Sequence, residues 1–119
     1  MTPKHDCLDF INMLQDPSKL DKGYAGALYQ QIVKEIKAFE STLDDTHEVG
    51  MRLVHFGDSM QFHVTAIKYI NPYLLLFFGH LDDGSPVELI QHISQLSFLI
   101  VKLKRLHPEK PKRPIGFLD

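Results

Sequence analysis

The sequence predicts an α+β domain of two layers, in which helices pack on one face of a three-stranded antiparallel meander. Three stretches lead to this prediction. Apolar side chains recur at helical spacing in residues 23–45, alternate with polar ones in residues 47–67, and return to helical spacing in residues 85–106. The expected order is α-α-β-β-β-α followed by an extended C-terminal tail. A chain of 119 residues has room for one core, so we treat 1–119 as a single domain.

The first expected element is a short amphipathic helix within residues 1–20, which form an N-terminal helix and loop. Asp6 is a suitable cap, and Asp16-Pro17 would end the helix because the residue before proline disfavours the helical region. The apolar face holds Cys7, Phe10, Ile11 and Leu14. We expect this helix to lie across one edge of the core, with Cys7 as a small buried side chain.

The second expected helix has the most regular apolar stripe in the chain. Its members are Ala25, Leu28, Ile32, Ile36, Phe39 and Leu43, with Tyr29 and Val33 beside them. Such a stripe is typical of a helix that buries one face. Asp44 and Asp45 follow it, and negative charge is unfavourable at a helix C-terminus, so these residues should belong to the next loop.

The following two strands should form a hairpin. Gly57-Asp58 fits a two-residue loop with glycine first. That loop would place Leu53 opposite Phe62 and Met51 opposite Val64, so that the apolar side chains of both strands share one face. His63 would then lie opposite Arg52 on the polar face.

The third strand is expected after the turn at Asn71-Pro72, and it is apolar on both faces. Alternation puts either Leu74, Leu76 and Phe78 or Tyr73, Leu75 and Phe77 on the face away from the helices. Left bare, that face would be an apolar patch of the kind that soluble monomers avoid. The tail or a second copy of the chain is expected to cover it, and we predict a homodimer.

Residues 85–106 are predicted to form one long helix after the turn Asp82-Asp83-Gly84. Ser85 is a suitable N-cap, Pro86 fits the first helical position, and Glu88 completes a capping box. The apolar row consists of Leu89, Ile93, Leu96, Ile100 and Leu103.

Phe98 would lie on the opposite side of this helix from the apolar row. Its polar neighbours there would be Gln91, Gln95, Lys102 and Arg105, together with Ser94. An aromatic side chain with a polar rim has the composition of a protein-binding hot spot. These residues are therefore the predicted partner site, although the N-terminal helix or the tail would bury Phe98 equally well.

The tail, residues 107–119, contains three prolines and is expected to be extended, with Ile115, Phe117 and Leu118 holding it to the body. It also continues a basic stretch. An anionic or nucleotide-like ligand or a nucleic acid, bound through this basic segment, is the alternative prediction, with Lys104, Lys110, Lys112 and Arg113 as the binding residues. A solvated basic tail would show the same composition.

Composition excludes several classes of function. The formal net charge is −2, so no overall basic field exists to hold a polyphosphate. One cysteine cannot form an internal disulfide or a multi-cysteine zinc site. No apolar run approaches the length of a membrane helix, and the first residues lack the apolar core of a signal peptide. A cytoplasmic protein without cofactor is expected.

No motif indicates catalysis. The seven histidines include no HExxH, and His55 and His63 should point to opposite faces, so we expect no metal site. Ser59, with Asp58 and His63 nearby, supplies the residue types of a catalytic triad, but turns collect such residues for backbone reasons. We therefore expect no catalytic residue and no enzyme.

Nucleic acid is also not an expected partner. The order helix, three antiparallel strands, helix also occurs in double-stranded-RNA-binding domains, which grip phosphate with basic residues at the start of the last helix. That start here reads SPVELIQH, with Glu88 and no lysine. The sequence thus favours a small non-catalytic binding or adaptor protein that acts through an apolar homodimer or partner interface.

Overall fold

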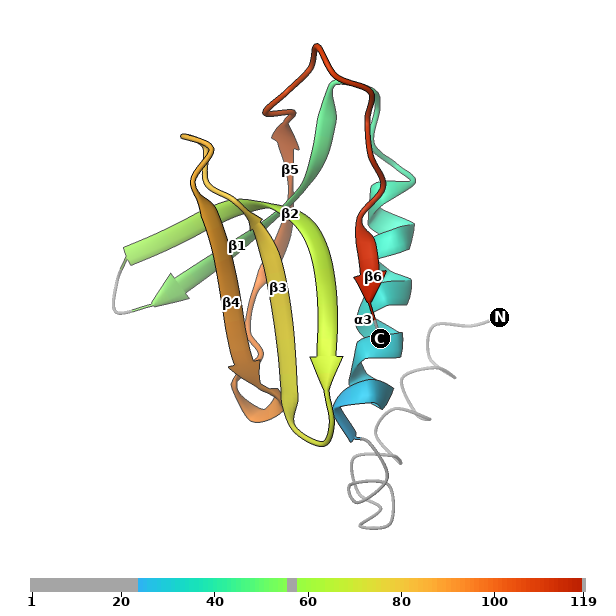
Figure 1. Cartoon of the computed structure of the whole chain (residues 1–119), viewed down its shortest axis with the longest axis vertical. Helices are drawn as coiled ribbons and strands as arrows, with labels where there is room; N and C mark the ends of the chain where they lie inside the picture. The colour runs from blue at the N-terminus through green and yellow to red at the C-terminus, as the bar shows by residue number, and fades with distance from the viewer. Residues whose placement is uncertain (1–23, 56–57, 119) are drawn as a thin grey trace.

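The computed structural model describes residues 24–55 and 58–118 as a small α+β domain with one α-helix and a six-stranded sheet (Figure 1). The elements are α3 (Tyr24–Glu40), β1 (His47–His55), β2 (Asp58–Ile70), β3 (Leu74–His80), β4 (Pro86–His92), a 3₁₀ turn (Ile93–Gln95), β5 (Leu99–Lys104) and β6 (Gly116–Leu118). The α+β class and the antiparallel meander β1–β2–β3 are as predicted. The helix predicted within residues 1–20 lies outside the described residues.

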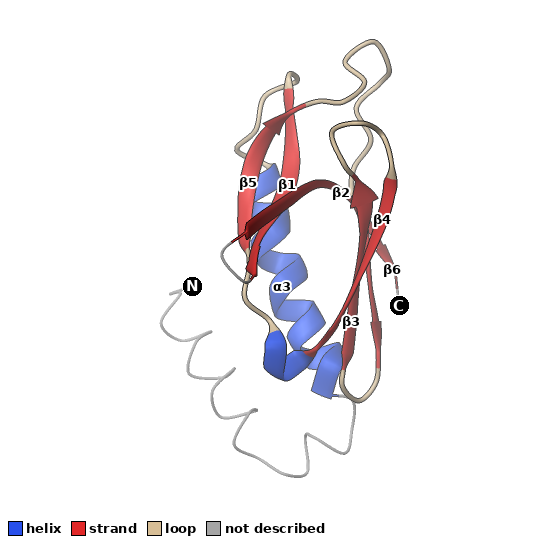
Figure 2. Ribbon diagram, turned by 90° about the vertical axis from the view of Figure 1, so that its left-hand side faces the viewer, coloured by secondary structure: helices blue, strands red, loops and turns tan. Residues whose placement is uncertain are grey.

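The sheet is organised around the long strand β2. Its strand order is β4-β3-β2-β1-β5, and all of these pairs are antiparallel. Along one side of β2, strand β1 pairs with residues 58–63 and the short β6 pairs in parallel with residues 66–68. The sheet curls, and α3 packs in the curve against β1, β2 and β3 (Figure 2).

Helix α3 begins where the turn between β2 and β3 supplies acceptors for its free N–H groups. The Ala25 N–H donates to the Pro72 carbonyl at 2.7 Å, and the Gly26 N–H donates to Asn71 Oδ1 at 2.9 Å. The helix buries Ala25, Leu28, Tyr29, Val33 and Ile36. The predicted stripe is confirmed, although its centre lies closer to Tyr29 and Val33 than the sequence indicated. Asp44 and Asp45 lie in the following loop, as expected.

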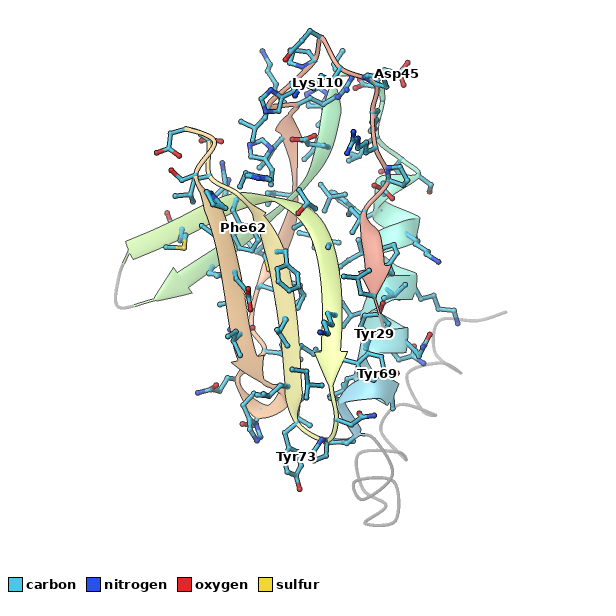
Figure 3. All side chains as sticks on the ribbon, viewed as in Figure 1. Tyr29, Asp45, Phe62, Tyr69, Tyr73 and Lys110 are labelled. Atoms are coloured by element: carbon cyan, nitrogen blue, oxygen red, sulfur yellow. The ribbon has the colours of Figure 1, made fainter. Side chains whose placement is uncertain are left out.

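The core lies between α3 and the concave face of the sheet. Its most buried large side chains are Phe62, Phe77, Ile36, Met51, Ile67, Leu75 and Val49. Tyr29 of α3 and Tyr69 of β2 meet at 4.7 Å between ring centroids, and Figure 3 shows the two rings together at the helix–sheet boundary. The third strand therefore turns Leu75 and Phe77 inward and Leu74, Leu76 and Phe78 outward.

The predicted register of the first hairpin is wrong by two residues. Met51 pairs with Phe62, Leu53 pairs with Met60, and Asp58 is already paired with His55. A shift of two residues keeps every side chain on its own face, so the apolar pattern satisfies both registers equally. Arg52 consequently lies opposite Gln61, whose Oε1 accepts hydrogen bonds from its guanidinium, and not opposite His63.

The predicted long helix over residues 85–106 is wrong. This segment forms β4, the 3₁₀ turn and β5, which pair with β3 and β1 at opposite ends of the sheet order. Leu89, Ile93, Leu96 and Ile100 still pack on the core, as their spacing predicted. The order of elements is therefore α-β-β-β-β-β-β within the described residues, not α-α-β-β-β-α.

The C-terminal tail is part of the fold. It returns to β2 and ends beside it as β6, with Ile115 buried and Phe117 packed against the core (Figure 1). Lys37 of α3 lies over the Phe117 ring at 5.2 Å from its centroid. The tail thus pairs with β2 in the plane of the sheet, and it does not fold over the outward-facing side chains of β3.

No helix within residues 24–55 and 58–118 combines the length and the apolar character needed to cross a membrane.

Candidate functional site

The main candidate site is the side of β2, β3, β4 and β6 that faces away from α3, which we call the outer face. Pairing sets its side chains in two adjacent rows across the sheet. One row runs Leu118, Lys68, Leu76, Ile90, and the next runs Gly116, Ala66, Phe78, Glu88. Ile70 and Leu74 pair with each other in a third row. The third strand thus lies at the middle of this surface and contributes Leu74, Leu76 and Phe78 to it, with His80 following at the strand end.

The outer face is exposed to solvent. Ile90 is 58% exposed, Leu118 48% and Ile70 44%. Leu76, which lies between Lys68 and Ile90 in its row, is only 7% exposed. Single exposed apolar residues are common in proteins, but an adjoining set on one face marks a surface that binds something.

A second cluster of note surrounds His63. This side chain is 3% exposed and lies between two carboxylates: Nδ1 is 2.5 Å from Glu48 Oε2, and Nε2 is 2.9 Å from Asp82 Oδ1. Glu48 Oε2 also accepts the Leu106 N–H at 3.2 Å. Since both ring nitrogens are engaged, His63 has none left for Ser59 or a substrate. The cluster joins β1, the turn after β3 and the segment after β5, which is a structural role.

Charged groups also gather where the tail passes the loop after α3. Asp44 Oδ1 accepts hydrogen bonds from the Thr46 N–H, the Thr46 hydroxyl and His47 Nδ1. The bond from His47, followed by those from Thr46, holds the pKa of Asp44 well below its usual range. Lys112 Nζ donates to the Asp44 carbonyl at 2.9 Å.

Arg105 strengthens the same junction. Its guanidinium donates to the Asp45 carbonyl at 3.0 Å and to the carbonyls of His107 and Lys110. Figure 3 shows Asp45 and Lys110 at this end of the molecule. The basic residues predicted for an anionic ligand are therefore partly engaged in holding the tail, since Lys112 has a protein acceptor, whereas Lys104, Lys110 and Arg113 are exposed. That ligand remains a prediction.

The residues predicted as a partner site around Phe98 do not share one helix face, because the helix is absent. Phe98 packs edge-on against Phe77 at 5.3 Å between ring centroids, so much of it belongs to the core. Gln91 is in β4 with a buried Oε1 atom, and Gln95 Oε1 accepts the His92 N–H at the 3₁₀ turn. Lys102 is exposed on β5. Partner binding by this set stays a prediction, and the helix face that it assumed does not form.

An open apolar concavity of about 410 Å³ lies where α3 begins. Its lining comes from α3, from Tyr73 before β3, and from the segment after β4: Tyr24, Leu28, Tyr73, His92, Ile93, Ser94 and Leu96. His92 is the one titratable imidazole there, and its ring stacks on Tyr73 while Nδ1 accepts the Ser94 N–H. The polar groups of His92 and Ser94 hydrogen-bond to each other at the 3₁₀ turn and do not point together into the concavity.

Within the described ranges, no group of three histidine, cysteine, aspartate or glutamate side chains is placed to hold a metal ion. His80 pairs with His63 across β2 and β3, and His92 lies at the far end of β4. The approach of His80 to His92 that a shared site would need does not occur, because β4 runs antiparallel to β3 and pairs His92 with Leu74.

A family model described as "Family of unknown function (DUF6173)" matches residues 16–118, which is most of the chain. The chain belongs to the DUF6173 family. No curated protein and no solved structure gave a match.

In this DUF6173 protein, the sequence indicated the outer face only in part. The alternation on β3 identified Leu74, Leu76 and Phe78 as one of two possible outward sets. Ile90 and Glu88 were missed because β4 was taken for a helix. The sequence signal for this strand is short: Val87 and Leu89 alternate with Glu88, but Ile90 and Gln91 break the alternation that the folded strand shows in its burial.

Proposed function

We propose that this protein is a small non-catalytic binding protein that acts through its outer face. The observation that carries the proposal is the adjoining set of outward apolar side chains on β2, β3, β4 and β6, among which Ile90, Ile70 and Leu118 are exposed. Exposed apolar surface of this kind, flanked by charged residues, is typical of protein interfaces.

The energetics support an occupant for this surface. Complete burial of one large apolar side chain contributes about 1.5–3 kcal/mol. Ile70, Ile90 and Leu118 are about half exposed in the isolated chain, so a large part of this burial free energy is still available when a partner binds. The rigid sheet beneath them also means that little conformational entropy is lost when a partner docks.

Among the residues that the structure describes, the groups that look reactive are engaged in contacts that hold the fold together. His63 is buried with both nitrogens engaged, and the carboxylates of Asp44 and Glu48 accept hydrogen bonds from the chain itself. These groups stabilise loops and strand ends. On the outer face, in contrast, the described part of the chain leaves Ile70, Ile90 and Leu118 exposed to solvent.

The proposal predicts that Ile90→Asp removes binding while the fold is retained. A charge in the centre of an apolar interface must be desolvated without a partner, so association should weaken by at least about tenfold. Leu99→Asp is the matched control, because Leu99 is 57% exposed but lies on β5, at the other edge of the sheet. Circular dichroism should show the same folded spectrum for both variants.

The measurement has two parts. Light scattering after size exclusion reports self-association over a range of protein concentrations, and tagged wild type, Ile90→Asp and Leu99→Asp report capture of other proteins. Binding that survives Leu99→Asp and is lost in Ile90→Asp supports the proposal. A mass near 13.7 kDa at every concentration, together with no capture that depends on Ile90, would refute it.

A further inference from the structure

The outer face carries two opposite charges at equivalent places on either side of an apolar centre. Lys68 of β2 lies opposite Leu76 of β3, and Glu88 of β4 lies opposite Phe78 of β3. Because β3 separates β2 from β4, the midpoint between Lys68 and Glu88 falls on β3 between Leu76 and Phe78. The surface is thus apolar at its centre, positive on one side and negative on the other.

These two charges do not neutralise each other within the chain. Two strand spacings and one two-residue step put their backbone positions about 12 Å apart. Among the residues that the structure describes, neither Lys68 nor Glu88 has an ion-pair partner. Each is therefore available to a charge on a docking molecule.

We propose that the occupant of the outer face is a second copy of this chain, docked face to face. The two-fold axis of this dimer lies in the plane of the interface, crosses β3 between Leu76 and Phe78, and is perpendicular to the line from Lys68 to Glu88. A two-fold axis exchanges the two sides of the surface. It brings Lys68 of one copy to Glu88 of the second copy, and it repeats the pair with the roles reversed. Leu76, Phe78 and Ile90 of both copies form the apolar centre of the interface.

The charge arrangement favours a second copy over an unrelated protein. An isologous interface requires a surface that is complementary to itself, and opposite charges on the two sides of an apolar centre meet this requirement. The formal net charge of −2 adds little repulsion between copies. This inference rests on the proposed function, because it names the partner of the same face.

Charge reversal tests the pairing. Lys68→Glu places two glutamates against each other twice in the dimer, and Glu88→Lys does the same with two lysines. Each single variant should raise the dissociation constant of the dimer by about tenfold or more, because like charges in an interface are unfavourable. Far-UV circular dichroism should show that both remain folded.

Two rescue experiments follow from the two-fold geometry. An equimolar mixture of the single variants forms heterodimers in which both contacts join opposite charges, so the mixture should dimerise nearly as well as wild type. The double variant Lys68→Glu/Glu88→Lys should do the same as a homodimer, and it keeps the wild-type net charge. Sedimentation velocity on each sample gives the dissociation constants.

The outcomes separate this inference from the proposed function. A wild-type dimer that is weakened by Ile90→Asp but not by either charge reversal would overturn the pairing and leave the binding face in place. The same holds if the mixture and the double variant stay as weak as the single variants. A monomeric wild type that still captures another protein in an Ile90-dependent way would overturn the second copy alone. If no binding of the wild-type protein depends on Ile90, both the proposed function and this inference are refuted.

Discussion

At the scale of single residues, His63 shows how one polar side chain fastens distant parts of the chain. Its two nitrogens reach Glu48 on β1 and Asp82 in the turn after β3, while Glu48 also holds the Leu106 N–H. A neutral imidazole donates through one nitrogen only, so both contacts are hydrogen bonds when the ring is protonated. The sequence placed His63 on the polar face opposite Arg52, and it could not indicate Glu48 and Asp82 as partners because neither is near His63 along the chain.

Replacing His63 should therefore destabilise the fold. In His63→Gln the ring that bridges the two carboxylates is lost, and the partly buried Glu48 loses a hydrogen-bond partner, so the free energy of unfolding should fall by about 2 kcal/mol. Urea unfolding measures the change. His107→Gln is the control, because His107 is exposed and has only a 3.3 Å contact with Glu109. Equal unfolding midpoints for the two variants would contradict the structural role of His63.

At the scale of elements, residues 85–106 show why a periodic pattern can mislead. Leu89, Ile93, Leu96 and Ile100 have helical spacing and do pack on the core. They do so from two strands and a connecting turn, since His92 caps a 3₁₀ turn at Ile93–Gln95 and the chain then reverses toward β5. The choice between helix and strand was made by backbone pairing with β3 and β1, which no local window of sequence contains.

The close approach of β3 to β2 gives an element-scale prediction. A Cβ atom at Gly79 would overlap the His63 carbonyl group and the Phe62 ring, so Gly79→Ala forces the strands apart. We expect a loss of about 3 kcal/mol in the free energy of unfolding. Gly116→Ala is the matched control in β6, since its Cβ would meet Ala66 Cβ at an ordinary 3.6 Å.

The control should change stability by no more than about 0.5 kcal/mol. Denaturant unfolding of the two alanine variants, measured side by side, decides the matter. Similar stabilities would show that β2 and β3 separate easily, against the tight pairing described above.

At the scale of the whole molecule, the tail completes the fold. It leaves β5, passes the junction held by Arg105 and Lys112, and returns to β2 as β6. Ile115 is the residue that joins this segment to the core, at 7% exposure. A tail that composition alone would class as a solvated basic segment is thus a structural part of the domain.

Ile115→Ala should accordingly lower the free energy of unfolding by about 2–4 kcal/mol, the usual effect of removing a buried branched side chain. Leu99→Ala, at an exposed position on β5, should have an effect below about 0.5 kcal/mol. Thermal unfolding followed by circular dichroism at low protein concentration compares the two without a contribution from self-association. An Ile115 variant as stable as the control would mean that the tail is not anchored.

The sequence by itself determined the α+β class of this domain, a helix within residues 23–45 and the meander of β1, β2 and β3, and it identified Leu74, Leu76 and Phe78 as one of two possible outward sets on β3. These features follow from local periodicity and turn chemistry, which a short window contains. Tertiary structure alone decided that residues 85–106 are strands, that His63 joins two acids, and that Lys68 and Glu88 flank one apolar face. Each of these depends on pairing between segments far apart in the chain, and strand register is fixed only when those segments meet.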